Sequence, residues 1–161
     1  SAGFAAQRRS ANPDAAAGGP LVSERIPAVE GWFSMDEADP RLIGNRCTSC
    51  GTVFFPKAQI ACRNPSCDGM QFEDVELSNR GRVWSYTTNH YAPPAPYVSP
   101  DPFEPYSVAA VELADEKLVV LGQVEGGSDG LRVGAEVELV LSTLFTDGEG
   151  DHVVWKWKVV A

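Results

Sequence analysis

The sequence has 161 residues, of which 43% are hydrophobic, and it carries a formal net charge of −9 at pH 7. This length fits one domain, or one small domain with an appendage, and the apolar content is sufficient for a buried core. The acidic balance argues against a nucleic-acid partner, because Lys and Arg make the contacts to phosphate, and no run approaches the roughly 18 apolar residues of a membrane span.

Residues 1–24 are rich in Ala, Gly, Ser and Pro and show no sustained apolar period. This composition is typical of a flexible tail or an interdomain linker. We therefore expect the segment to be mobile and to connect the chain to a domain upstream.

Residues 25–45 predict a helical arm that packs on the body of the protein. Asp39 and Pro40 suit the start of a short helix and Gly44 its end, since Pro fits the first helical position and Gly the left-handed position after the last. The apolar side chains available for docking this arm are Val29, Trp32, Phe33, Leu42 and Ile43.

All four cysteines lie in residues 46–78, where the pair Cys47 and Cys50 is followed by the pair Cys62 and Cys67. Two short cysteine pairs on facing turns deliver four thiolates to a tetrahedral ion, which predicts a zinc ribbon. A site with four cysteines has no open position, so the zinc is structural. Iron in a rubredoxin-like site uses similar ligands, and disulfides or free thiols are further alternatives. Because no secretion signal opens the sequence and clustered thiols favour a reducing compartment, we expect a cytoplasmic protein.

Residues 79–161 contain five runs with a period near two, separated by turns rich in Gly, Pro and Asp. The runs cover residues 81–91, 106–113, 117–125, 135–145 and 152–160. Five short antiparallel strands without a repeat or a long helical pattern predict a mainly β fold with an OB-type barrel, with an SH3-like barrel as the alternative.

The chain shows no arrangement of residues that is typical of catalysis. His90 and His152 lie in or beside predicted strands, without a cysteine or serine partner, and we interpret both as structural or surface residues. Paired carboxylates such as Asp115 with Glu116 fall at turns, where solvated charge is the simpler interpretation. We therefore predict no catalytic residues.

The first run of the barrel carries two aromatic residues at alternate positions. Strict alternation places one set of its side chains inside the barrel and another outside. The inward set is Val83, Ser85 and Thr87, and the outward set is Arg82, Trp84, Tyr86, Thr88 and His90. Outward aromatic and arginine side chains are typical anchors of a protein interface. Alternatively, the helical arm around Trp32 and Phe33 covers them.

The segment after this run holds six of the twelve prolines together with further aromatic residues. A loop this stiff loses little entropy when it docks, so it either lines the mouth of a partner's active site or packs against its own barrel. The predicted interface comprises Arg82, Trp84, Tyr86, His90, Tyr91, Tyr97 and Phe103.

The cysteine window, "RCTSCGTVFFPKAQIACRNPSC", and the following "FEDVELSNRGRVWSYTTNHY" and "VELADEKLVVLGQV" resemble an acyl-CoA-associated family, long catalogued as a domain of unknown function. This family joins a rubredoxin-like zinc ribbon to an OB-fold, and the resemblance covers about residues 30–161. It is nearest to the C-terminal domain of actinobacterial enoyl-CoA hydratase subunits that act on steroid side chains. The departure is the four residues between Cys62 and Cys67, where many relatives have two.

The resemblance implies an accessory module that binds a thiolase-like, lipid-transfer-protein-type aldolase in a heteromeric complex. That aldolase would cleave a β-hydroxyacyl-CoA by a retro-aldol reaction, as in cholesterol catabolism. The resemblance also implies a hydratase domain linked upstream.

The last run of the chain bears on where the CoA would lie. Trp155 and Trp157 share one face, which we expect in the core, and Lys156 and Lys158 share the other. Holding the ADP moiety of CoA normally takes several convergent cations or a helix N-terminus, and two lysines are at most a minor contact. We therefore expect the CoA thioester to be bound mainly by the partner.

Two further functions stay open at this stage. A zinc ribbon with an OB barrel also occurs in proteins that bind single-stranded nucleic acid, and a four-cysteine site with iron would make a rubredoxin-like electron carrier.

Overall fold

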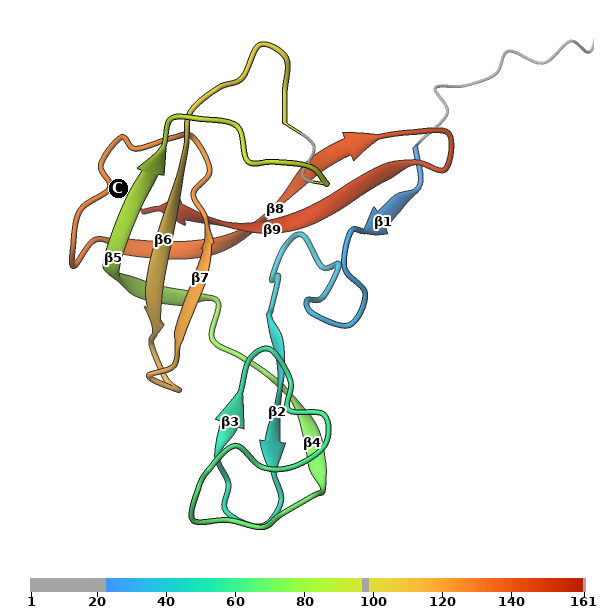
Figure 1. The fold of residues 1–161 in the computed structure, drawn as a ribbon, viewed down its shortest axis with the longest axis vertical. Coiled ribbons are helices and arrows are strands. Elements are labelled where there is room, and N and C mark those ends of the chain that lie inside the picture. The colour runs from blue at the N-terminus through green and yellow to red at the C-terminus, as the bar shows by residue number, and fades with distance from the viewer. Residues whose placement is uncertain (1–22, 97–98, 161) are drawn as a thin grey trace, which may run out of the picture.

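A computed structural model describes residues 23–96 and 99–160, and in these ranges the chain forms nine β-strands in two sheets (Figure 1). The strands are β1 (Arg25–Pro27), β2 (Ile43–Cys47), β3 (Val53–Phe54), β4 (Phe72–Glu76), β5 (Arg80–Asn89), β6 (Tyr106–Leu113), β7 (Val119–Gln123), β8 (Glu136–Thr146) and β9 (Asp151–Val159). Most of the predicted tail, residues 1–22, lies outside the described residues. The described ranges contain no helix that is long and apolar enough to cross a membrane.

The smaller sheet has the order β3-β2-β4, with both neighbours antiparallel to the central β2 (Figure 1). The buried amide of Asn45 in β2 ties the following loop to this sheet. Its Nδ2 donates to the Ala58 carbonyl at 2.7 Å, and its Oδ1 accepts from the Ala58 N–H at 3.0 Å. A buried amide whose donor and acceptor are both satisfied holds this loop in one position.

The helical arm predicted for residues 25–45 is wrong, because the described residues contain no α-helix. The chain instead forms β1 and then folds back on itself, so that Phe33 and Leu42 form an antiparallel bridge. The Ile43 N–H donates to the Trp32 carbonyl at 2.8 Å. The residues between Pro40 and Gly44 are too few to nucleate a helix, and strand pairing satisfies their backbone groups instead.

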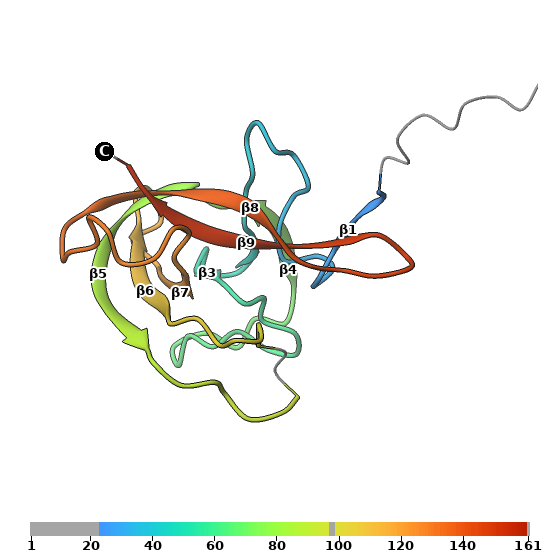
Figure 2. The same cartoon turned by 90° about the horizontal axis from the view of Figure 1, so that it is seen from above.

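The larger sheet has the order β1-β9-β8-β5-β6-β7, and it closes on itself through a parallel bridge between Val124 and Trp157. The Glu125 N–H donates to the Trp157 carbonyl at 2.7 Å, which joins the strand after β7 to β9. The five strands β5 to β9 thus form the predicted barrel, seen from above in Figure 2. The β8–β9 hairpin extends beyond the barrel, and β1 pairs with β9 near its tip.

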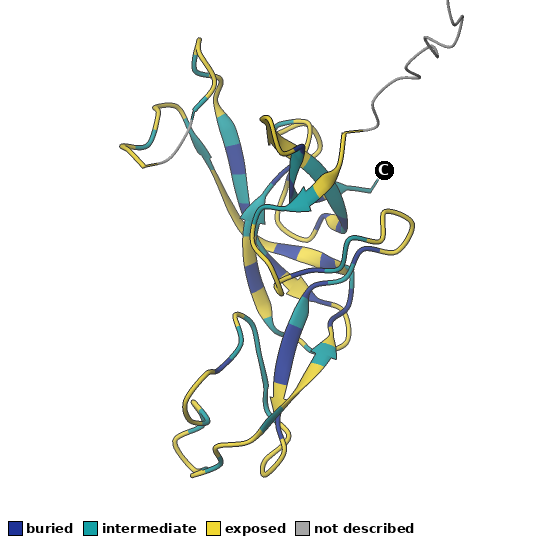
Figure 3. Cartoon of the chain, turned by 90° about the vertical axis from the view of Figure 1, so that its right-hand side faces the viewer, coloured by how far each residue is buried: buried dark blue, intermediate teal, exposed yellow. Residues whose placement is uncertain are grey.

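The core of the protein lies mainly inside this barrel, whereas the loops of the small sheet are largely exposed (Figure 3). Trp157 is fully buried, which confirms its predicted position, and Trp155 packs beside it at the edge of the core. Gly122 in β7 lies directly against these rings. An added Cβ there would lie 2.6 Å from Trp155 Cη2 and 2.9 Å from Trp157 Nε1, so the backbone approaches this closely only because Gly lacks a side chain.

A row of aromatic rings joins the small sheet to the barrel. Trp32 contacts Phe55 edge to face with centroids 5.5 Å apart, Phe55 contacts Trp155 at 6.2 Å, and Trp155 contacts Trp157 at 5.8 Å. Such edge-to-face pairs contribute about 0.5–1.5 kcal/mol each beyond their buried area. The row therefore fixes the small sheet against the barrel.

Candidate functional site

The first cysteine pair lies where β2 ends in a tight turn. Cys47 is the last residue of β2, and its carbonyl accepts from the Gly51 N–H at 2.8 Å. Gly51 has φ of 76°, a left-handed conformation that Gly adopts without a steric penalty. The turn brings Cys50 back toward Cys47.

The second cysteine pair is held by a different turn. The Cys62 N–H donates to the Gly69 carbonyl at 2.8 Å, and the Cys67 N–H donates to the Asn64 carbonyl at 3.0 Å. The Asn64 side chain accepts from the Ser66 N–H at 3.0 Å, so a local turn takes up the longer spacing of this pair. The Gly69 N–H points at Cys67 Sγ at 3.3 Å, and a Cβ on Gly69 would lie 2.8 Å from Cys47 Sγ.

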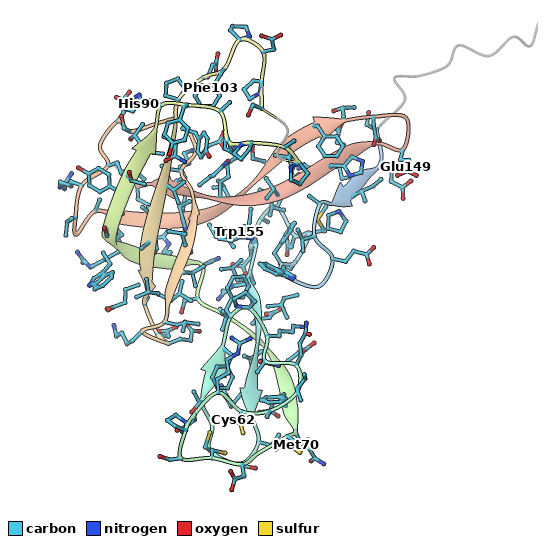
Figure 4. All side chains as sticks on the ribbon, viewed as in Figure 1. Cys62, Met70, His90, Phe103, Glu149 and Trp155 are labelled. Carbon is cyan, nitrogen blue, oxygen red and sulfur yellow. The ribbon has the colours of Figure 1, made fainter. Side chains whose placement is uncertain are left out.

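The four sulfur atoms lie together at the tip of the small sheet, where Figure 4 labels Cys62. All four lie within 4.8 Å of one another, with Cys47 Sγ 3.9 Å from Cys67 Sγ and Cys50 Sγ 3.6 Å from Cys62 Sγ. Four thiolates about 2.3 Å from a tetrahedral zinc ion are about 3.8 Å apart. The four-cysteine cluster is therefore consistent with a structural zinc ribbon.

The pKa values of the thiols differ across this cluster. The hydroxyl and then the backbone N–H of Thr52 lower the pKa of Cys50 to about 6, because both donate to its thiolate. Burial raises the pKa of Cys62 to about 12. Desolvation thus opposes ionisation of Cys62, and the positive charge of a bound metal ion would favour the thiolate form of all four cysteines.

The predicted interface residues of β5 do not share one face, because a β-bulge interrupts the strand. Val83 pairs with Val111 of β6, but the next pair is Ser85 with Ala110, so Trp84 is the extra residue. Beyond the bulge the alternation is reversed, and Tyr86 pairs with the buried Ala109. Tyr86 therefore lies on the side of β5 that faces the barrel interior, and Ser85 and Thr87, expected inside, lie outside.

These aromatic residues are nevertheless accessible. Trp84 is 65% exposed and Tyr86 is 44% exposed. The alternative that the segment around Trp32 covers them is wrong, since both rings are exposed and the Trp32 ring packs against Phe55 instead.

His90 and Phe103, two further predicted interface residues, lie at the end of the molecule far from Cys62 (Figure 4). Tyr91 is 75% exposed and His90 is exposed. Phe103 is half-buried against Tyr106, with ring centroids 6.3 Å apart. Tyr97 lies outside the described residues.

A cleft of about 580 Å³ lies between the proline-rich loop and strands β8 and β9. Its lining includes Glu104 from the loop, Thr143 from β8 and Lys156 from β9. The Lys156 ammonium is 3.5 Å from a Glu125 carboxylate oxygen, so its charge is already partly compensated. Among the described residues, this cleft offers no cluster of cations that could hold a diphosphate.

Two exposed apolar residues of β7 were not singled out from the sequence. Leu121 is 67% exposed and Val119 is 42% exposed, on the outer side of the barrel beside Ala110. The alternation of side chains along a strand could have indicated this exposure, because the neighbours of a buried residue such as Val120 point to the opposite face of the sheet.

A four-cysteine ribbon attached to a five-stranded OB-type barrel defines a two-part, all-β class of protein. Two family models match the two parts in order, the rubredoxin-like zinc ribbon domain of ChsH2 at residues 36–73 and the C-terminal OB-fold domain of ChsH2 at residues 74–142. The chain belongs to this ChsH2 family, also called DUF35.

Similar proteins span most of the chain. It is 34% identical over 123 residues to a DUF35 domain-containing scaffold protein of Methanocaldococcus jannaschii, covering 73% of this chain and 79% of that protein. It is 36% identical over 115 residues to the benzoylsuccinyl-CoA thiolase subunit BbsA of Thauera aromatica, covering 71% and 73%.

Two further similarities concern hydratase and aldolase components. A probable enoyl-CoA hydratase alpha subunit of Thermomonospora curvata is 34% identical over 119 residues, but the chain covers only 34% of its length. The solved structure titled Ltp2-ChsH2(DUF35) aldolase matches with a TM-score of 0.54 and 29% identity, covering 74% of this chain and 84% of that chain.

Proposed function

We propose that this protein is an accessory subunit that binds and activates a thiolase-like enzyme acting on acyl-CoA thioesters. The observation that carries the proposal is the similarity, over both the ribbon and the barrel, to a thiolase subunit and to a component of an aldolase. The exposed aromatic residues at β5 and at the proline-rich loop supply contact area for such a partner.

We further propose that the partner is a lipid-transfer-protein-type aldolase. Its substrate would be a steroid whose side chain carries the β-hydroxyacyl-CoA group. In the retro-aldol step the bond between the α and β carbons breaks, the β-hydroxyl loses its proton and becomes the carbonyl of a ketone, and the α carbon gains a proton to leave a short acyl-CoA. The partner holds most of the CoA, because the cleft beside Lys156 lacks convergent cations. A hydratase domain linked upstream stays a prediction.

The test is co-expression with a thiolase-like protein from the native host of this chain. We expect a stable complex with a buried interface above about 1,000 Å². We also expect cleavage of a steroid β-hydroxyacyl-CoA by the complex and little cleavage by the partner alone. Separate elution of the two proteins, together with equal cleavage with and without this chain, would refute the proposal.

The substrate is tested separately from the accessory role. A complex that cleaves a β-ketoacyl-CoA thiolytically, but not the β-hydroxyacyl-CoA, would retain the accessory role and overturn the aldolase assignment. Metal analysis of the same preparation tests the electron-carrier alternative. A red protein that contains iron would support this alternative, and a colourless protein that contains zinc would exclude it.

A further inference from the structure

Strand β5 is paired along only part of one of its edges. On one side it pairs with β6 from Gly81 to Asn89. On the other side it pairs with β8 only from Arg80 to Arg82, and the Val83 backbone then bonds to Gly134 and Ala135. Beyond Val83, no strand of the described residues pairs with this second edge, and Figure 2 shows β5 and β8 diverging there.

The register identifies which backbone groups point away from the sheet. The Ala114 N–H donates to the Arg80 carbonyl, and the Val124 N–H donates to the Ser107 carbonyl, so even-numbered residues of β6 face β5 and odd-numbered ones face β7. Since Tyr86 and Thr88 pair with the odd-numbered Ala109 and Ser107, their own N–H and C=O groups point to the open edge.

Apart from the bulge at Trp84, the residues of this edge lack the features that usually protect an exposed strand. Edge strands are normally guarded by charged residues, most often Lys, or by Pro within the strand. Residues 83–100 contain no Asp, Glu, Lys or Arg, although the whole chain has 35 such residues, and the open part of β5 contains no Pro. The exposed rings of Trp84 and Tyr91 flank it. Depletion of charge with enrichment of aromatic residues is typical of the core of a protein interface.

We propose that the open edge of β5, residues 84–89, binds an extended segment of the thiolase-like partner as an added β-strand. The proposal rests on the proposed function for the identity of the partner. The outward N–H and C=O groups of Tyr86 and Thr88 are two residues apart, which is the spacing at which an added strand presents its own N–H and C=O groups. Pairing of a partner's extended segment with a sheet edge is an established mode of recognition. A second copy of this chain is the less favourable occupant, because two surfaces that each carry a net charge of −9 repel one another.

Amide hydrogen exchange on the wild-type chain tests this pairing directly. In the free chain, the amides of Tyr86 and Thr88 should exchange quickly, whereas the amide of Thr87, which bonds to β6, should exchange slowly. In the complex, exchange at Tyr86 and Thr88 should slow by at least about tenfold, with Thr87 unchanged.

The contrary outcomes can be told apart. A complex that forms without slowing exchange at Tyr86 and Thr88 overturns the edge pairing and leaves the proposed function intact. Failure of the wild-type chain to form any complex overturns the proposed function and the pairing with it. Protection that appears without the partner and rises with protein concentration identifies a second copy as the occupant, which also overturns the proposal.

A pair of variants at Thr88 gives an independent readout. Thr88→Pro removes the outward N–H without breaking a bond to β6, and Thr88→Val keeps it. Both variants lose the Thr88–Ser107 hydroxyl contact of 2.9 Å, so they are matched for that loss. Thr88→Pro should weaken the complex at least about tenfold relative to Thr88→Val. Equal affinities, with both variants folded by circular dichroism, would contradict the proposal.

Discussion

Gly122 shows how one residue limits the packing of the barrel. The space that a side chain would need is taken by the rings of Trp155 and Trp157, and Trp155 is itself held by Phe55. The ring cannot move aside without disturbing the junction with the ribbon.

We predict that Gly122→Ala lowers the free energy of unfolding by about 1–3 kcal/mol, the usual cost of overpacking a core. The control is Gly148→Ala at the β8–β9 turn, where an added Cβ meets no atom within 4 Å. Denaturant unfolding of both variants measures the difference. A Gly122→Ala variant as stable as the control would show that the rings yield easily.

At the scale of elements, the ribbon has few buried residues with which to fold on its own. Cys47 and Ala58 are among its few buried apolar residues, and most of its loops are exposed. A zinc ion in a four-cysteine site can supply about 10–16 kcal/mol of apparent binding free energy.

We predict that removal of the metal with a strong chelator unfolds the ribbon and leaves the barrel folded. Amides of β2 and β4 should then exchange quickly, while those of Ala109 and Val111 in the barrel stay protected. Retained protection in β2 after complete metal removal would show that the ribbon is stable without metal. Restoring zinc, measured as reprotection of the same amides, controls for irreversible damage.

The β8–β9 hairpin ends in a turn that is organised by one carboxylate. The Glu149 N–H donates to Asp147 at 2.9 Å, and the His152 ring lies 2.9 Å from the same side chain and stacks on Phe145. The Glu149 N–H, and after it His152, hold the pKa of Asp147 below its ordinary value.

The depressed pKa of Asp147 makes the turn sensitive to acid. Because the folded pKa lies below the unfolded one, the stabilisation is complete above about pH 4 and is lost as the pH falls through the folded value. We expect the amide resonance of Glu149, whose N–H donates to Asp147, to shift in this acid range as Asp147 takes up a proton. The Asp147→Asn variant should lack this transition, and an identical titration in that variant would refute the assignment.

At the scale of the whole molecule, the acidic net charge predicts that the protein does not bind nucleic acid. With 22 acidic residues against 13 basic ones, the chain should repel single-stranded DNA and RNA, although OB-folds often bind them. We expect no retention on immobilised single-stranded DNA, even at low ionic strength. Retention that falls as salt is added would instead support the nucleic-acid function.

Much of this architecture could be predicted because its signals are local. The five barrel strands follow from a period of two, and the clustering of Cys47, Cys50, Cys62 and Cys67 follows from their spacing. The turn that Asn64 provides within the wider pair was not anticipated.

The errors have a common physical cause in long-range pairing. Asp39, Pro40 and Gly44 carry genuine helix-end preferences, but the hydrogen bond from Ile43 to Trp32 outweighs them. The bulge at Trp84 could not be predicted from the residues of β5 alone. A bulge is defined by the pairing with the opposing strand, and no residue type in β5 marks which position is left unpaired. One extra residue was enough to reverse the faces of the rest of β5.

Because of the aromatic row from Trp32 through Phe55 to Trp155 and Trp157, the intrinsic tryptophan fluorescence of the protein reports on the position of the ribbon. Three of the four tryptophans of the chain lie in this row, at the boundary between the small sheet that carries the cysteines and the barrel. Displacement of the ribbon would expose Trp155 to water and shift the emission of the protein to longer wavelength. The state of the ribbon can thus be followed by intrinsic fluorescence, without any label.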